Sequence, residues 1–485
     1  SNFRAGVNAG NSIESGGNYN TVVGDEAGTA LTTGDGNVAI GYQAGDALTT
    51  SSSNTAVGYE ALSTQIAYSE NTAIGYRALK TTNEGYSNTA VGHETLMANT
   101  NGTNNTAVGH DALTANTTGT RNTAVGALAG DANTEGNYNS AFGYNSLGAN
   151  TTGTHNTALG DFSQAANTTG TKNVSIGQGS FITNTTGDNN TVVGTEAMTA
   201  NTTASNNTAV GHQALYANTT GTQNVAVGSS AGDAMTTANN NVTVGHNSMG
   251  ANTTGSSNVA VGAAALAANT TAGSNTAVGN GALTANTIGF NNTAVGANSL
   301  DANVSGDYNV AMGTLALTTD ASGNKTTAIG YAALYNQNPA SGADVFNTAV
   351  GYAAGTAVTT GIQNTFVGAD AGDATTTGGY NTAVGKDALG ANTTGGHNVA
   401  VGRLALKSNT TANNNVAVGN ETLNANTTGT SNTAVGHAAL LANTTADNNT
   451  AVGFYSLFAN TTGAGNSALG KSTMAANTTG NNNTA

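Results

Sequence analysis

The chain repeats a pattern of apolar and polar positions with a period of 17 residues. The unit is clearest at residues 105–121, NTAVGHDALTANTTGTR, where the third, fourth, eighth and ninth positions are apolar and Asn, Thr or Gly fills most others. Its fifth residue is a glycine in every copy, as at Gly109. A unit this short cannot bury a core alone, so the pattern predicts coils that stack on one another.

Residue types within the unit favour strands over helices. Thr106 and Val108 are both β-branched and stand two apart, which is typical of a strand. Gly109 is expected to end this strand with a positive φ, and the run Ala112 to Thr118 is predicted as a second strand before an Asn-Thr-Thr-Gly corner. Each repeat is therefore predicted to hold two strands and two turns. The helix-like fragment at residues 111–115 is too short to persist.

Two apolar rows are predicted to form a thin core. One row stands beside the glycine and the other four residues after it, as in Val57, Ile74, Val91 and Val108, and in Leu62, Leu79, Leu96 and Leu113. Among the copies after the first, six place glycine in the second row: Gly28, Gly45, Gly130, Gly232, Gly355 and Gly372. Four of these gain an apolar residue three positions later, which is expected to fill the volume: Leu31, Leu48, Met235 and Val358. The copies with Asn133 and Thr375 show no such replacement.

The first position is asparagine in nearly every copy, with Thr326 as the exception. Stacked coils would bring these amides into register, so we expect a ladder of hydrogen bonds along the axis. The alternative is that some of the amides bind a ligand or ion. The ladder is represented by Asn105, Asn122, Asn156, Asn207, Asn258 and Asn432. The predicted turn glycines of the same copies are Gly109, Gly126, Gly160, Gly211, Gly262 and Gly436.

The repeat extends over residues 1–485 and predicts a single β-solenoid shaft of roughly 27 repeats, one per coil. Four extra residues interrupt the spacing in the segment 336–346, which holds the only proline, Pro339, and is predicted to be a surface loop. The sequence stops three residues into a repeat, so we expect it to be a segment of a longer protein.

Composition excludes several classes of function. Only 7% of the residues are charged and the net charge is −15, which does not fit a nucleic-acid-binding protein. No apolar stretch approaches the length of a membrane span, so no membrane insertion is expected of this segment. The chain has no cysteine and so gives no signal about its redox compartment.

A thin core predicts a second buried surface, which copies of the chain would supply by associating around a common axis. The blocks AIGYRA at 73–78, AVGHET at 90–95 and AFGYNS at 141–146 resemble the head repeat of trimeric autotransporter adhesins. They are also similar to NTAIGY-type repeats in shafts of phage tail fibres and of bacterial surface proteins with a C-terminal intramolecular chaperone. The resemblance implies a left-handed parallel β-roll, a homotrimeric rod, adhesion, and an extracellular location on a bacterial cell surface or virion fibre.

Candidate chemistry is sparse. Five of the seven histidines follow the repeat glycine: His93, His110, His212, His246 and His437. His93 and His110 lie one repeat apart and are weak candidates for a metal or anion site, the alternative being an exposed aromatic row. Gly-Asp pairs recur at residues 45–46, 130–131, 232–233 and 372–373 and are predicted to be turn acids, because calcium sites need several carboxylates per turn. No cofactor and no catalytic residue is expected.

The sequence therefore predicts a structural or adhesive extracellular fibre shaft rather than an enzyme. Such a shaft would space or present a receptor-binding tip and bind a cell-surface receptor or glycan through many weak contacts. Two alternatives stay open, an ice-binding solenoid and a filament subunit that assembles head to tail. Against ice binding, the doublet Thr117-Thr118 would send its side chains to opposite faces.

Overall fold

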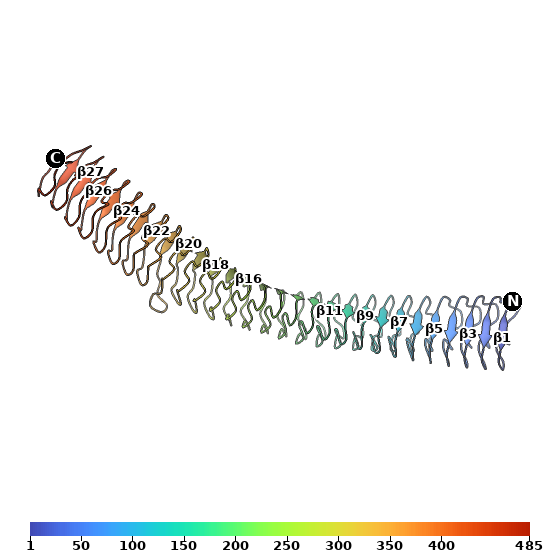
Figure 1. Ribbon diagram of the computed structural model, residues 1–485. Coiled ribbons are helices and arrows are strands. Elements are labelled where there is room, and N and C mark those ends of the chain that lie inside the picture. Colours follow the sequence, from blue (N-terminus) through green and yellow to red (C-terminus); the bar gives the residue numbers. More distant parts are fainter. The chain divides into compact units, whose positions relative to one another are not determined.

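The computed structural model describes residues 1–485 and divides the chain into two compact units, Ser1–Asn241 and Val242–Ala485. Each unit is an all-β parallel solenoid without helices, in which one 17-residue repeat forms one coil. Figure 1 shows the coils of each unit lying one on the next, with the strands side by side. The predicted fold class, an all-β parallel solenoid with one repeat per coil, is confirmed.

Every strand is three residues long. The strands of the first unit are β1 (Phe3–Ala5), β2 (Thr21–Val23), β3 (Val38–Ile40), β4 (Thr55–Val57), β5 (Thr72–Ile74), β6 (Thr89–Val91), β7 (Thr106–Val108), β8 (Thr123–Val125), β9 (Ser140–Phe142), β10 (Thr157–Leu159), β11 (Val174–Ile176), β12 (Thr191–Val193), β13 (Thr208–Val210) and β14 (Val225–Val227). The strands of the second unit are β15 (Val242–Val244), β16 (Val259–Val261), β17 (Thr276–Val278), β18 (Thr293–Val295), β19 (Val310–Met312), β20 (Thr327–Ile329), β21 (Thr348–Val350), β22 (Thr365–Val367), β23 (Thr382–Val384), β24 (Val399–Val401), β25 (Val416–Val418), β26 (Thr433–Val435), β27 (Thr450–Val452) and β28 (Ser467–Leu469).

Each coil contains one strand, so the prediction of a second strand at Ala112 to Thr118 is wrong. This segment is a series of turns, because Asp111 and Leu113 have positive φ values of 58° and 51° that an extended strand does not allow. Its amides still bond between coils. The N–H of Asp111 donates to the carbonyl of His93 in the preceding coil at 3.0 Å, and that of Leu113 donates to the carbonyl of Ala129 in the following coil at 3.0 Å.

The interior of each coil is narrow and is filled by alanine and leucine. In the β7 coil Ala107 and Ala112 are fully buried and Leu113 is 2% exposed. The predicted leucine row is confirmed: Leu62, Leu79, Leu96 and Leu113 are all buried.

The predicted apolar row beside the glycine is not in the core. Val108 is 37% exposed, and the other members of this row also face outward: Val57, Ile74 and Val91. A strand sends alternate side chains to opposite faces, so Thr106 and Val108 share the outer face while Ala107 alone points inward. The inward position is alanine in most strands, and larger side chains are buried there in only a few coils, as at Val22, Val192 and Phe366.

The six glycines that replace the core leucine all have φ between 54° and 61°, close to the value that Leu113 adopts. The four compensating side chains are confirmed in the core at 0–1% exposure: Leu31, Leu48, Met235 and Val358. In the copy with Thr375, Phe366 of β22 fills the space instead. It is fully buried, and its ring atoms lie 2.5–2.8 Å from where a Cβ on Gly372 would stand.

The copy with Asn133 is left underpacked. A cavity of about 10 Å³ lies beside Gly130 and is lined by Leu113, Leu147 and the side chain of Asn133. The side chain of Leu113 leans toward it, with Cδ2 3.1 Å from the position of a Cβ on Gly130. Such a volume holds at most about one water molecule.

The insertion also explains the exceptional Thr326. Gln337 lies in the β20 coil and is buried, and its Nε2 donates to Thr326 Oγ1 at 3.0 Å and to Asp320 Oδ2 at 2.6 Å. Its Oε1 accepts from Nδ2 of Asn347, the next first-position residue, at 2.8 Å. The longer amide of Gln337, at the twelfth position of the same coil, thus takes the place of the missing asparagine. Val345 anchors the loop and is fully buried.

We expect Gly130→Leu to stabilise the protein by about 1 kcal/mol, because it adds buried apolar surface next to a cavity at a φ that leucine already adopts in neighbouring coils. Gly372→Leu is the matched control and should destabilise by about 1–3 kcal/mol, since the Phe366 ring occupies the space. Thermal unfolding of both variants measures the effect. A loss of stability in Gly130→Leu would contradict the assignment of an underpacked coil.

Candidate functional site

The first-position asparagines form the most regular polar feature of the fold. The six predicted members are at most 1% exposed. In each of them Oδ1 accepts the backbone N–H of the first-position residue of the next coil at 2.9–3.0 Å. Nδ2 donates to the carbonyl of the fifteenth residue of the same coil at 2.7–2.9 Å. One side chain therefore closes its own coil and also ties it to the next.

A second asparagine ladder runs beside the first and was not predicted. Asn116 Nδ2 donates to Asn99 Oδ1 at 2.7 Å, and the same amide-to-amide bond recurs in each coil up to Asn218. Asn116 also donates to the carbonyl of Gly119 at 3.0 Å, the same acceptor that Asn105 uses. The sequence feature that could have predicted this ladder is the asparagine that recurs in the Asn-Thr-Thr-Gly block. The block was interpreted only as a corner.

The six predicted turn glycines end their strands with φ between 127° and 139°. A second constraint acts at Gly109, where a Cβ would lie 2.5 Å from the carbonyl oxygen of Gly126 in the next coil. The position therefore needs glycine both for its backbone angle and because the neighbouring backbone approaches closely.

Histidine and tyrosine side chains after the glycine form a stacked row on coils β3 to β7. Neighbouring ring centroids are 4.9–5.4 Å apart along the sequence Tyr42, Tyr59, Tyr76, His93 and His110. Such separations are typical of aromatic pairs. The small Ala127 follows in the next coil and ends the stack.

The structure brings the two candidate histidines together with a carboxylate that the sequence reasoning did not include. His110 Nδ1 lies 3.2 Å from Asp111 Oδ2, and His93 Nδ1 lies 3.8 Å from Asp111 Oδ1. The two imidazoles are 47% and 58% exposed, whereas Asp111 is 23% exposed. The ligand atoms of all three lie within 4.8 Å of one another. The other histidines of the row, His212, His246 and His437, are not part of such a group.

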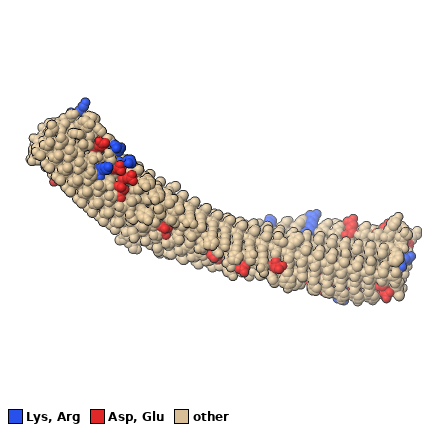
Figure 2. Space-filling view, in the orientation of Figure 1, with Lys and Arg blue, Asp and Glu red and all other residues tan.

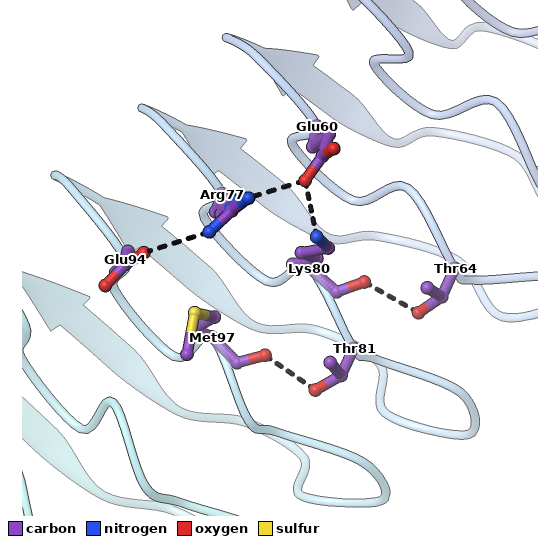
Figure 3. A network of polar contacts seen from close by, with 7 residues as sticks. All are labelled: Glu60, Thr64, Arg77, Lys80, Thr81, Glu94 and Met97. Carbon is purple, nitrogen blue, oxygen red and sulfur yellow. Dashed lines mark hydrogen bonds and ion pairs between the residues drawn. The ribbon is translucent and has the colours of Figure 1, made fainter.

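Figure 3 shows an ion-pair ladder on neighbouring coils. It adjoins the aromatic row, since the Arg77 guanidinium lies 4.9 Å from the centre of the Tyr76 ring. Arg77 bridges two coils, with Nε 3.0 Å from Glu60 Oε2 and an Nη atom 3.6 Å from Glu94 Oε1. Lys80 also contacts Glu60. The hydrogen bond from Lys80 is the main cause that lowers the pKa of Glu60.

The Gly-Asp pairs place their acids singly on the turns. Burial raises the pKa of each of these carboxyls, and backbone amides of the same turn oppose the shift. Burial likewise raises the pKa of Asp301 and of Asp320. The six carboxyls concerned are Asp46, Asp131, Asp233, Asp301, Asp320 and Asp373.

The outward side chains of the strands make an uncharged strip along each unit, which we call the strand face. It consists of the first and third residue of every strand, and in all 28 strands these are Thr, Ser, Val, Ile, Leu, Met, Phe or Ala. The third residues are partly or fully exposed, and Val108 and Val125, for example, are each 37% exposed. Figure 2 shows how few charged side chains interrupt the visible surface. No helix long and apolar enough to cross a membrane is present.

We expect Asn207→Leu to lower the free energy of unfolding by roughly 2–5 kcal/mol, because the backbone N–H of Asn224 loses its acceptor inside the coil and the carbonyl of Gly221 loses one donor. Asn206→Gly is the control, since Asn206 is exposed and has a φ of 62° that glycine adopts readily. Chemical denaturation of both variants gives the comparison. Equal stability of Asn207→Leu and wild type would show that the ladder is dispensable.

The raised aspartate pKa values predict an unusual pH dependence. A carboxyl whose folded pKa is raised stabilises the fold when protonated, so its contribution is lost as the pH rises through the folded value. We therefore expect the thermal midpoint to rise as the pH falls from 7 to about 4, against the opposing effect of Glu60 and Asp344, whose pKa values are lowered. Replacing Asp46, Asp131 and Asp233 by Asn should reduce this dependence. A midpoint that falls steadily on acidification would refute it.

Comparison with known proteins does not add a family to this architecture. No family model matches the chain, and the search of curated proteins finds no relative. The chain is accordingly characterised by its fold, a parallel β-solenoid of 17-residue coils held by two asparagine ladders.

Proposed function

We propose that the protein is a structural shaft whose chains associate side by side through the strand face. The observation that supports this most directly is the strand face itself, a row of exposed Val and Ile side chains with Thr beside it. Monomeric proteins rarely leave a long continuous apolar strip in water. Burying it between copies would supply the second surface that a core made mainly of alanine and leucine needs.

A second copy of the chain fits this strip better than an unrelated partner. The strands pair in register from coil to coil, so the strip repeats at about the 4.8 Å spacing of neighbouring strands. Another copy has the same spacing and can repeat each contact in every coil. The strip has no charge, so two copies do not repel there although each chain carries a net charge of −15.

The remaining features of the proposal come from the resemblance of the repeat blocks to fibre and adhesin repeats. They are a homotrimer, an extracellular position on a bacterial surface or virion fibre, and attachment to a receptor or glycan. A regular array of identical coils supports such a role, because weak contacts repeated along several chains add up to strong avidity.

Ice binding is the second candidate, and one observation favours it. Thr and Val alternate on the strand face two residues apart, as in Thr106 and Val108, which gives the flat ordered array that the doublet Thr117-Thr118 does not. Larger side chains interrupt the array at Phe142, Leu159 and Met312. An ice lattice does not adapt to such steps, whereas a protein partner can repack around them, so self-association is the first proposal.

The test is the native mass of the whole chain and of a strand-face variant, measured by light scattering. In the triple variant Val108→Lys, Val125→Lys and Val227→Lys, charges replace three residues that are each 37% exposed. We expect wild type to have three times the mass of one chain and the variant to have the mass of one chain, because a buried lysine at each contact loses hydration without a partner.

The control carries the same charges elsewhere. Thr114→Lys, Ala165→Lys and Tyr216→Lys lie at the tenth position of their coils, where Lys80 and Lys407 occur naturally, and should leave the mass unchanged. A monomeric wild type would refute association. If such a monomer inhibited ice recrystallisation and the strand-face variant did not, ice binding would take its place.

A further inference from the structure

We propose that His93, His110 and Asp111 bind a divalent transition-metal ion of the zinc class. The three side chains meet on two adjacent coils, β6 and β7, at the end of the aromatic row. Two imidazoles and one carboxylate are ligands that zinc takes in proteins. This inference does not depend on the proposed shaft function.

The distances are close to those of a metal site. Donor atoms about 2.0–2.1 Å from a tetrahedral zinc ion lie roughly 3.3 Å apart. The separations from Asp111 to His110 and to His93, 3.2 Å and 3.8 Å, are near this value. The carboxylate thus has one oxygen near the Nδ1 atom of each stacked imidazole.

The carboxylate has an unused acceptor. Asp111 Oδ1 is buried and has no hydrogen-bond partner, although buried carboxylate oxygens are normally satisfied. It is the oxygen nearer His93. An ion between these groups would satisfy it.

The histidines have the freedom that binding requires. Their rings are stacked at an interplanar angle of 8°, and a metal ion must lie near the plane of each ring that binds it. Both imidazoles must therefore rotate toward Asp111. They are 47% and 58% exposed, and Ala127 leaves space on the far side of His110. The coordination positions that these three residues do not fill would face solvent.

No nearby lysine or arginine competes with a metal ion for the Asp111 carboxylate. Glu94, at the seventh position of the His93 coil, is engaged by Arg77. No lysine or arginine forms an ion pair with Asp111, whose ion-pair partners are the two histidines. The surface around the group therefore offers a cation an anionic ligand that no fixed cation neutralises.

The test is isothermal titration of the full chain with Zn²⁺ at pH 7.5. We expect one equivalent to bind per chain, at least tenfold more weakly in Asp111→Asn and in His110→Ala. Asn145 and Asn247 occupy the position of Asp111 in other coils, and Ala127 and Ala263 that of His110, so both variants should fold. Circular dichroism melting checks this.

His212→Ala is the matched control, because His212 occupies the same row position without belonging to such a group, and its binding should equal wild type. Cobalt(II) provides an independent readout, since His₂Asp coordination should give visible absorption bands that His93→Ala removes. The proposal is overturned if no equivalent of Zn²⁺ binds, or if Asp111→Asn and His212→Ala lower the affinity equally. The latter result would mean general surface binding by exposed histidines.

Discussion

The fold depends on the asparagine at the start of each coil. Because each coil has only three residues in a strand, strand pairing alone supplies few of the hydrogen bonds that the backbone needs. The amide of residues such as Asn105 supplies both an acceptor and a donor in the dry interior, joining the next coil through Oδ1 and its own coil through Nδ2. A leucine side chain can make neither bond. Where Thr326 interrupts the row, Gln337 supplies the missing amide.

The same narrow geometry determines what the surface looks like. The middle residue of each short strand, usually alanine, points into the interior with the leucine row, so the β-branched residue beside the glycine lies outside. Stacking then aligns these side chains into a continuous strip, while the few charged residues, apart from Arg4 in β1, lie outside the strands. A protein built this way presents the same uncharged strand face in coil after coil.

Side-chain groups found in only one place on the molecule occur where the sequence departs from the repeat. The group of His93, His110 and Asp111 exists because two successive coils carry histidine after the glycine and the second adds aspartate. A missing core leucine also has a local effect: Phe366 fills the space at Gly372, whereas a small cavity remains at Gly130. In a solenoid each coil contacts only its neighbours, so such changes are absorbed within one or two coils.

The sequence by itself determined the period, the stacked parallel coils, the buried leucine row and the positive φ of the turn glycines, because these follow from residue types that recur at fixed spacing. The tertiary structure decided which face of the strand is inside, since Thr106, Ala107 and Val108 alternate equally well in either orientation. It also decided that residues 112–118 form turns, because the left-handed angles of Asp111 and Leu113 are imposed by bonds to neighbouring coils. The approach of Asp111 to two histidines of different coils likewise depends on side-chain directions that spacing alone does not fix.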